Sequence, residues 1–317
     1  MLSKPLTRRA AVQVDLRQYM VYIGFVALFV FFSIYLRDSG FTSTNNLLNI
    51  VRQTAIIATM AVAMTFVIAA GQIDLSVGAV AGLSSVTTAM AIERWGVVAG
   101  ITAGLLTGIA VGGINGLLVT RLVIPSFLVT LGMMGIARGL AEWITDAGPV
   151  PITSSFYNNV FGSGEVGPIP SLLFWIVVAT VIGAVALRKT PYGRQVLATG
   201  GNEPAARFSG VDTRRIGFLV LMVSGVVAAL AGMLYAGRLS SGRYSLGQAD
   251  ELSVIAAVVL GGTSLFGGGG SVLGSVLGAL LIGVVNNGLI LMGLESSQQV
   301  IVRGGIIILA VALARRK

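Results

Sequence analysis

Long apolar runs, separated by short polar or glycine-rich connections, follow one another along nearly the whole chain. A helix needs about 20 residues to cross the roughly 30 Å hydrocarbon core of a bilayer, and most of these runs are close to that length. The pattern therefore predicts an all-α fold, a polytopic transmembrane helical bundle of about ten spans, with interrupted or half-helices where a run is short. The predicted spans are residues 19–36, 50–70, 77–92, 96–119, 122–143, 171–187, 216–236, 252–266, 271–292 and 299–314.

Basic residues gather in the connections on one predicted side of the membrane. The tail 1–18, the loop 188–215 and the end 315–317 are basic, whereas the loop 144–170 contains two acidic residues and no Lys or Arg. Short loops rich in Lys and Arg stay in the cytoplasm, and ten crossings put the three basic segments on the same side. We therefore expect a cytoplasmic N-terminal tail, one transmembrane domain over residues 19–314, and a cytoplasmic C-terminus.

Composition narrows the chemistry that this bundle can perform. The 317 residues are 55% hydrophobic and only 10% charged, and they include neither His nor Cys. The commonest general base, thiol nucleophiles and His/Cys metal sites are therefore missing. The acidic residues are scattered, so we predict neither catalytic residues nor a metal site. The net charge of +9 is explained by cytoplasmic loops, and no nucleic-acid partner is expected.

Glycine is frequent and partly periodic. In the span 96–119, glycines recur at every fourth residue from Gly100 to Gly116. Such ladders of small residues make a smooth helix face on which another backbone packs closely in lipid. We interpret this ladder as a structural packing face.

Two polar segments, AAGQIDLSVG (69–78) and LGGTSLFGGGG (260–270), interrupt apolar runs and echo each other weakly. Non-helical backbone at membrane depth is tolerated only where it is buried in protein or lines a cavity, and broken helices in the two halves of a carrier often mark its pathway. Asp74 contacts substrate or caps the helix that begins near Leu75, and the sequence leaves both roles open. A repeated Asn-Gly-Leu adds two further polar positions. The candidate pathway residues are Asp74, Ser76, Asn115, Thr263, Ser264 and Asn287.

Arg138 and Glu142 are charged residues inside the predicted span 122–143. Residues four apart are neighbours on one face of a helix. We expect the two side chains to form a local ion pair.

The segment GNEPAARFSGVDTRR (201–215) is short, polar and basic. Asn202 is a good N-cap, Pro204 suits a first turn, and Gly210 is a natural helix stop, so the segment predicts a two-turn helix in the cytoplasmic loop. A helix this short is marginal in water and needs a surface to hold it. It is either a connector lying against the protein's own inner ends or a docking helix for a cytoplasmic partner.

A family resemblance rests on several motifs in combination and extends from about Asn46 to Ala314. The chain resembles the sugar permeases of ABC importers, of the ribose/galactose/xylose type, within the group that also holds branched-chain amino acid permeases. The motifs are GQIDLSVGAVAGL (71–83), PSFLVTLGMMGIARGLA (125–141), GNEPAARFSGV (201–211), ELSVIAAVVLGGTSLFGGGGSVLG (251–274) and NNGL (286–289).

The resemblance implies an importer of a monosaccharide that works by alternating access in the bacterial inner membrane. It implies three protein partners: an ATP-binding cassette ATPase that holds ATP and Mg, a periplasmic or extracellular sugar-binding protein, and a second permease subunit that makes a homodimer. The segment that resembles the family's coupling loop contains Glu203, Ala205, Ala206 and Gly210.

Two other functions stay open: an ion-coupled secondary carrier, and an ABC permease for a non-sugar substrate such as branched-chain amino acids. A phosphate-binding loop needs a lysine after glycine, yet the only lysines are Lys4, Lys189 and Lys317, and none has that setting. We therefore expect no cofactor in this chain and ATP hydrolysis on a separate one.

Overall fold

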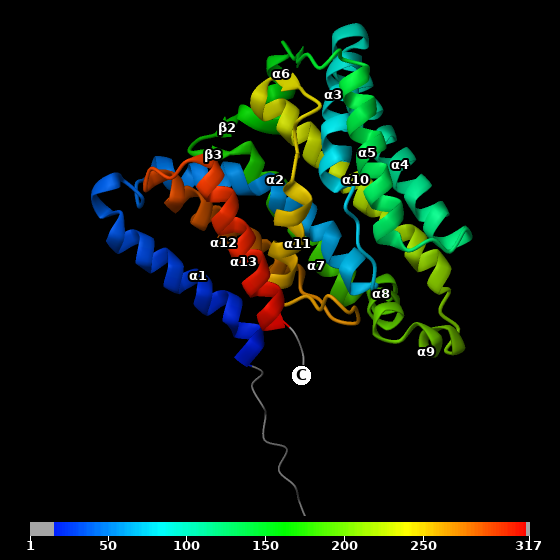
Figure 1. Ribbon diagram of the computed structural model, residues 1–317. Coiled ribbons are helices and arrows are strands. Elements are labelled where there is room, and N and C mark those ends of the chain that lie inside the picture. The colour runs from blue at the N-terminus through cyan, green and yellow to red at the C-terminus, as the bar shows by residue number, and fades with distance from the viewer. Residues whose placement is uncertain (1–15, 315–317) are drawn as a thin grey trace, which may run out of the picture.

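The computed structural model describes residues 16–314 and is mostly helical (Figure 1). The tail 1–15 and the end 315–317 lie outside the described residues, so their cytoplasmic location stays a prediction. The all-α helical bundle is confirmed. The helices are α1 (Leu16–Tyr35), α2 (Thr44–Ala69), α3 (Val77–Trp95), α4 (Val97–Arg121), α5 (Ser126–Trp143), α6 (Ser155–Asn158), α7 (Ser171–Lys189), α8 (Pro191–Gly201), α9 (Glu203–Phe208), α10 (Thr213–Leu239), α11 (Asp250–Leu260), α12 (Val272–Leu291) and α13 (Ser296–Ala314), with the short helices η1 (Arg37–Ser39) and η2 (Asn159–Ser163).

Nine of the ten predicted spans coincide with helices of 18 or more residues within the described chain. The exception is 252–266, where α11 has only 11 residues and ends at Leu260. The following glycines stop it, because Gly262 has a φ of 86° that favours glycine. Within residues 16–314, five helices, α2, α4, α7, α10 and α12, are both long and apolar enough to cross a membrane by length and composition.

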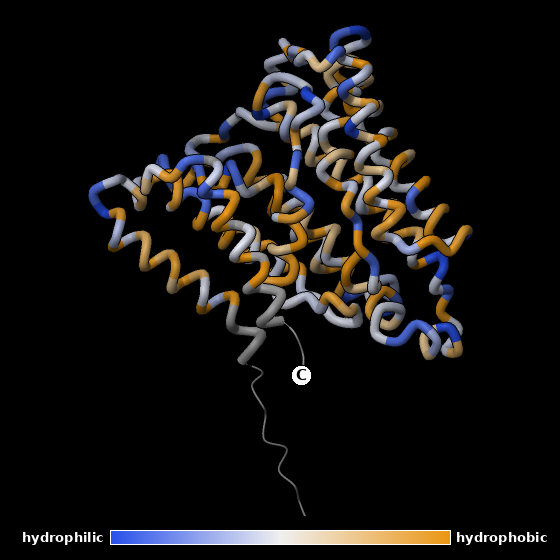
Figure 2. The backbone as a smooth tube through the Cα atoms, in the orientation of Figure 1, coloured by the Kyte–Doolittle hydropathy of each residue, from blue (hydrophilic) through white to orange (hydrophobic). Residues whose placement is uncertain are grey.

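Polar segments gather at two opposite ends of the bundle. Figure 2 shows hydrophobic residues along the long helices and hydrophilic ones mainly in the connections. Helices α8 and α9 form one end, which we call the α9 end (Figure 1). The other, the strand end, holds α6 and two short antiparallel pairs: β1 (Val150–Pro151) with β4 (Ser241–Gly242), and β2 (Glu165–Val166) with β3 (Ile169–Pro170).

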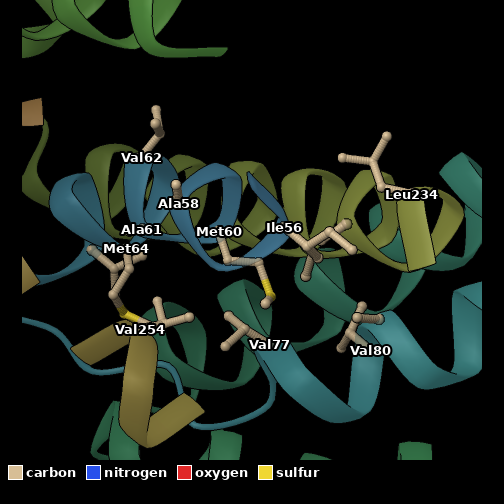
Figure 3. Close-up of a cluster of buried hydrophobic side chains, with 14 of the residues drawn as sticks. Ile56, Ala58, Met60, Ala61, Val62, Met64, Val77, Val80, Leu234 and Val254 are labelled. Atoms are coloured by element: carbon tan, nitrogen blue, oxygen red, sulfur yellow. The ribbon is translucent and has the colours of Figure 1, made fainter. Parts of the chain in front are cut away.

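Helix α2 runs through the centre of the bundle. It is buried almost continuously from Thr54 to Ala69, as expected of a helix that is apolar all round. Figure 3 shows Met60 directed toward Val77 of α3 and Met64 toward Val254 of α11. These residues belong to one large core cluster that also includes α10. The central position of α2 brings its last residues next to most other elements at the α9 end.

The glycine ladder of α4 packs against α3 and α10, which confirms its structural interpretation. A methyl group added at Gly108 would overlap Gly225 of α10, and one at Gly112 would lie 2.7 Å from the carbonyl oxygen of Leu221. The two backbones therefore approach each other without side chains between them.

Two long helices are each followed by an extended segment and a further helix. Residues 70–76 connect α2 to α3, and residues 240–249, which include β4, connect α10 to α11. Gly78 and Gly247 bring these two units into backbone contact. The weak sequence similarity between 69–78 and 260–270 is therefore wrong as a guide to corresponding connections in the two halves of the bundle. The segment 260–270 lies one connection later, between α11 and α12. Short similar sequences occur easily by chance in glycine-rich connections. The order of the helices is therefore the better guide to equivalent places.

Candidate functional site

The extended segment 70–76 carries a buried polar cluster, which we define as Asp74, Ser76, Asn115 of α4 and Ser224 of α10. Asp74 is only 1% exposed. Its Oδ1 accepts hydrogen bonds from the backbone N–H (2.9 Å) and Oγ (2.6 Å) of Ser76, and its Oδ2 accepts one from Ser224 Oγ (2.7 Å). Asn115 Nδ2 donates to Ser76 Oγ at 3.0 Å. Three of the predicted pathway residues are thus brought together.

The structure gives Asp74 a role other than the expected N-cap. The helix α3 begins at Val77, and its N-cap is Ser76. The carboxylate reaches the backbone N–H two residues on, which is an Asx-turn just before the helix, and it reaches Ser224 across the bundle. Expecting a cap near Leu75 was therefore wrong, because the chain stays extended for two more residues. Asp74 instead fastens the interruption to α10.

Helix α5 fastens the same segment from another side. Ser126 Oγ accepts the backbone N–H of Ile73 at 3.1 Å, and Thr130 Oγ1 accepts that of Leu75 at 3.0 Å. These bonds pair backbone groups that the interruption leaves without helical partners. Asn115 Oδ1 has no hydrogen-bond partner among the described residues. The segment 70–76 is consequently held by three helices at once.

The other three predicted pathway residues lie elsewhere. Thr263 and Ser264 are in the connection 261–271, where Thr263 Oγ1 accepts the backbone N–H of Ser271 at 3.3 Å. Asn287 of α12 exchanges two side-chain hydrogen bonds of 2.9 Å with Asn46 at the start of α2. The six residues therefore occupy three places along α2, and their contact with a substrate stays a prediction.

The expected ion pair between Arg138 and Glu142 is wrong. No ion pair joins these residues in the described part of the chain, whereas Arg138 interacts electrostatically with Glu251 of α11. Glu251 is buried, and its Oε2 has no hydrogen-bond partner among the described side chains. The i, i+4 spacing makes Arg138 and Glu142 neighbours on the helix, but it does not fix the direction of their long side chains.

Helix α9 has both of the predicted caps. Asn202 Oδ1 accepts the backbone N–H of Ala205 at 3.0 Å, which confirms the N-cap. Gly210 has a φ of 86° and follows the last turn, and the N–H of Val211 bonds to the carbonyl of Ala206 at 3.0 Å. This is the hydrogen-bond pattern of a glycine stop, so the predicted two-turn helix is confirmed.

The inner face of α9 is fixed to its own chain. Ala206 is only 5% exposed. Glu203 Oε1 accepts from Arg207 at 2.6 Å and from Thr213 Oγ1, at the start of α10, at 3.1 Å. Of the four predicted coupling residues, Ala206 therefore faces inward, while Glu203, Ala205 and Gly210 are exposed.

The outer face of α9 carries a residue that the sequence reasoning missed. Phe208 is 94% exposed and borders a hollow of about 320 Å³ together with Glu203, Pro204 and Arg207. Large aromatic side chains are uncommon as isolated, fully exposed groups and are enriched at the centres of interfaces. The signal was present in the sequence, since an aromatic residue stood within a polar loop.

Helix α8 rests on the end of α2. The ring of Tyr192 stacks on Phe66 with centroids 5.9 Å apart. Burial raises the pKa of Tyr192 to about 12, so its phenol stays neutral at physiological pH. Helix α9 is thus connected to the bundle through an anchored helix.

The sequence is similar to a family of transport proteins and to individual permeases. The family described as "Branched-chain amino acid transport system / permease component" matches residues 46–311. The ribose import permease protein of Bacillus subtilis (strain 168) is 42% identical over 298 residues, which cover 93% of this chain and 92% of the relative. The ribose import permease protein of Escherichia coli (strain K12) is 39% identical, covering 88% of each chain. An L-arabinose ABC transporter permease protein of Azospirillum brasilense is 35% identical, covering 97% of this chain and 90% of the relative. No solved structure gives a significant match.

Proposed function

The chain belongs to the family of branched-chain amino acid transport system permease components, and we propose that it is the permease subunit of an ATP-driven, binding-protein-dependent importer of a monosaccharide. It is a multi-pass inner-membrane protein of a transporter family. The proposed substrate is a pentose, a hexose or a related polyol, because the relatives named above are permeases for ribose and L-arabinose.

The observation that carries the proposal is helix α9. It is capped at both ends, fixed to α10 through Glu203 and Thr213, and exposes Phe208 almost completely. A connector between two spans needs no such aromatic group in water, whereas a docking helix uses it as an anchor. The proposed occupant is an ATP-binding cassette ATPase, which binds ATP and Mg on its own chain.

The interrupted helices support alternating access. Segments 70–76 and 261–271 give the bundle two non-helical connections at which helices can change direction. In the proposed cycle the polar cluster holds 70–76 together with α4 and α10 as one unit while other helices move. An ion-coupled secondary carrier is not favoured by the relatives, which include ABC transporter permeases.

A second permease copy is the proposed partner within the membrane. Methyl groups added at Gly132, Gly135 and Gly139 of α5 would meet nothing within 4 Å, although the glycines of the α4 ladder, at every fourth residue from Gly100 to Gly116, are closely packed. Small residues favour helix association in lipid, so an uncovered face of this kind supports a homodimer. The α9 end is proposed to face the cytoplasm with both termini, and the strand end to face the sugar-binding protein.

Co-purification tests the proposed partner. The ATP-binding cassette ATPase of the proposed importer is expected to co-purify with this chain in detergent. Phe208→Ala removes an anchor of about 2 kcal/mol or more, which corresponds to a roughly 30-fold weaker affinity. Ser209→Ala, at the neighbouring exposed position, is the control and retains the ATPase. Equal recovery of the ATPase with both variants would contradict docking through this face.

A further inference from the structure

At the α9 end, α8 makes backbone-to-backbone contacts with two other segments. One is the end of α2, from which the connection 70–76 continues, and the other is the connection 261–271; we call these two connections the interrupted connections. We call the contact region the glycine joint and define it as Ala69, Gly200, Gly201, Gly267 and Gly268. A methyl group added at Gly200 would overlap the carbonyl oxygen of Ala69, the last residue of α2. Three segments far apart in the sequence therefore meet here without side chains between them.

The connection 261–271 closes the other side of the joint. Gly268 donates its backbone N–H to the carbonyl of Ala69 at 2.9 Å. A methyl group at Gly267 would lie 2.5 Å from the carbonyl oxygen of Gly200, and one at Gly268 would lie 2.6 Å from Cα of Gly201. Gly267 and Gly268 also have φ values of 83° and 74°, which favour glycine. Conformation and space both require glycine at these two positions.

The joint is close in sequence to three elements: α9, the connection 70–76 and α12. Only Asn202 separates Gly201 from α9. The chain continues from Ala69 into 70–76, which the polar cluster fastens to α4 and α10. From Gly268 it continues into α12, where Ser275 Oγ accepts from Thr65 Oγ1 of α2 at 2.8 Å.

Two contacts hold α8 against α2. The Tyr192–Phe66 ring stack holds one end of α8, and the Gly200–Ala69 contact holds the other. Protein interiors packed this closely have low compressibility and transmit displacement. A shift of α9 therefore displaces the end of α2 and the loop before α12 together.

We propose that the glycine joint is the coupling element that carries movement of α9 to both interrupted connections, with Gly200 and Gly267 as its positioning residues. This rests on the proposed docking of an ATPase at α9. The residues of the joint move together. A side chain added inside the joint therefore uncouples ATP hydrolysis from transport and leaves the docking surface of α9 unchanged.

Matched alanine variants in the reconstituted permease–ATPase complex test the proposal. Gly200→Ala is paired with Gly269→Ala, whose added methyl group meets nothing within 4 Å. Gly267→Ala is paired with Gly262→Ala, which has a similar φ of 86° and open space around it. Each pair separates the contact in the joint from the general effect of replacing a glycine.

We expect Gly200→Ala and Gly267→Ala to lower the number of sugar molecules imported per ATP hydrolysed by about tenfold relative to their controls, within the roughly 5- to 150-fold range of coupling between sites. ATPase recovery and basal hydrolysis stay at the wild-type level. Wild-type import by both joint variants would overturn the proposal, and so would loss of either variant from the membrane or of its ATPase, because the joint would then be a folding or docking element. Failure of the wild-type chain to bind an ATPase would instead contradict the proposed function.

Discussion

Replacing Asp74 by leucine is expected to destabilise the permease more than any conservative change at the same position. The leucine removes the acceptor for three donors: the N–H and Oγ of Ser76 and the Oγ of Ser224. The Ser224 hydroxyl can turn to the helix carbonyl four residues earlier, which leaves two unpaired buried donors. Each costs about 1–3 kcal/mol, so the change costs about 2–6 kcal/mol, a large part of a typical total stability of about 5–15 kcal/mol.

Asparagine keeps the geometry of the cluster. Its carbonyl oxygen replaces Oδ1 for both bonds from Ser76, and its NH₂ group donates to Ser224 Oγ, because a hydroxyl both donates and accepts. We therefore expect Asp74→Asn to cost about 1 kcal/mol. The expected order of stability is wild type, then Asp74→Asn, then Asp74→Leu.

The assay is the temperature at which half of the detergent-solubilised protein loses its monodisperse peak. One kcal/mol shifts a melting temperature by roughly 2–4 °C in domains of 150–250 residues, so Asp74→Leu is expected at least about 4 °C below wild type. Thr180→Val is the control, since among the described residues the Thr180 hydroxyl bonds only the carbonyl of Ile176, in its own helix. A leucine variant as stable as this control would refute the role of the cluster. An asparagine variant as unstable as leucine would show that charge, and not hydrogen bonding, matters.

Three further expectations concern packing, orientation and assembly. Gly108→Leu should remove the permease from the membrane, because its side chain would overlap α10, whereas Gly113→Leu, with nothing within 4 Å of its added Cβ, should insert normally. Quantitative membrane blotting measures both, and equal insertion would contradict close packing of α4 on α10. Cysteine at the exposed Ser209 should react with an impermeant thiol reagent only after permeabilisation, and cysteine at the exposed Ser163 in intact cells; the opposite labelling would invert the topology. Gly135→Cys should form a disulfide between two copies under oxidation, seen as a band of doubled mass on a non-reducing gel, and its absence would argue against α5 as the contact.

Local patterns predicted the helices well, for physical reasons. The helix α2 and most other spans follow from apolar runs long enough to cross a bilayer, and α9 follows from Asn202 and Gly210, which act within their own turn. The short α11 was misjudged by six residues, because apolar character continues past the glycines that end the helix.

Tertiary contacts could not be predicted in the same way. Ser224 was one hydroxyl in an apolar span, and nothing local indicated that it would meet Asp74, 150 residues away in the sequence. The inward direction of Ala206 depends on how α9 lies against α10. The ion pair expected between Arg138 and Glu142 is absent from the described chain, because sequence spacing does not fix the direction of two long side chains.

Uptake into proteoliposomes tests the central claim most directly. The purified chain is reconstituted with the ATPase and the sugar-binding protein of the proposed importer, and import of labelled ribose and L-arabinose is measured with and without ATP at the α9 side. The account predicts uptake of a sugar that requires ATP and both partner proteins and that is lost when either partner is omitted. Sugar uptake by this chain alone, driven by a proton or sodium gradient and indifferent to ATP, would contradict it.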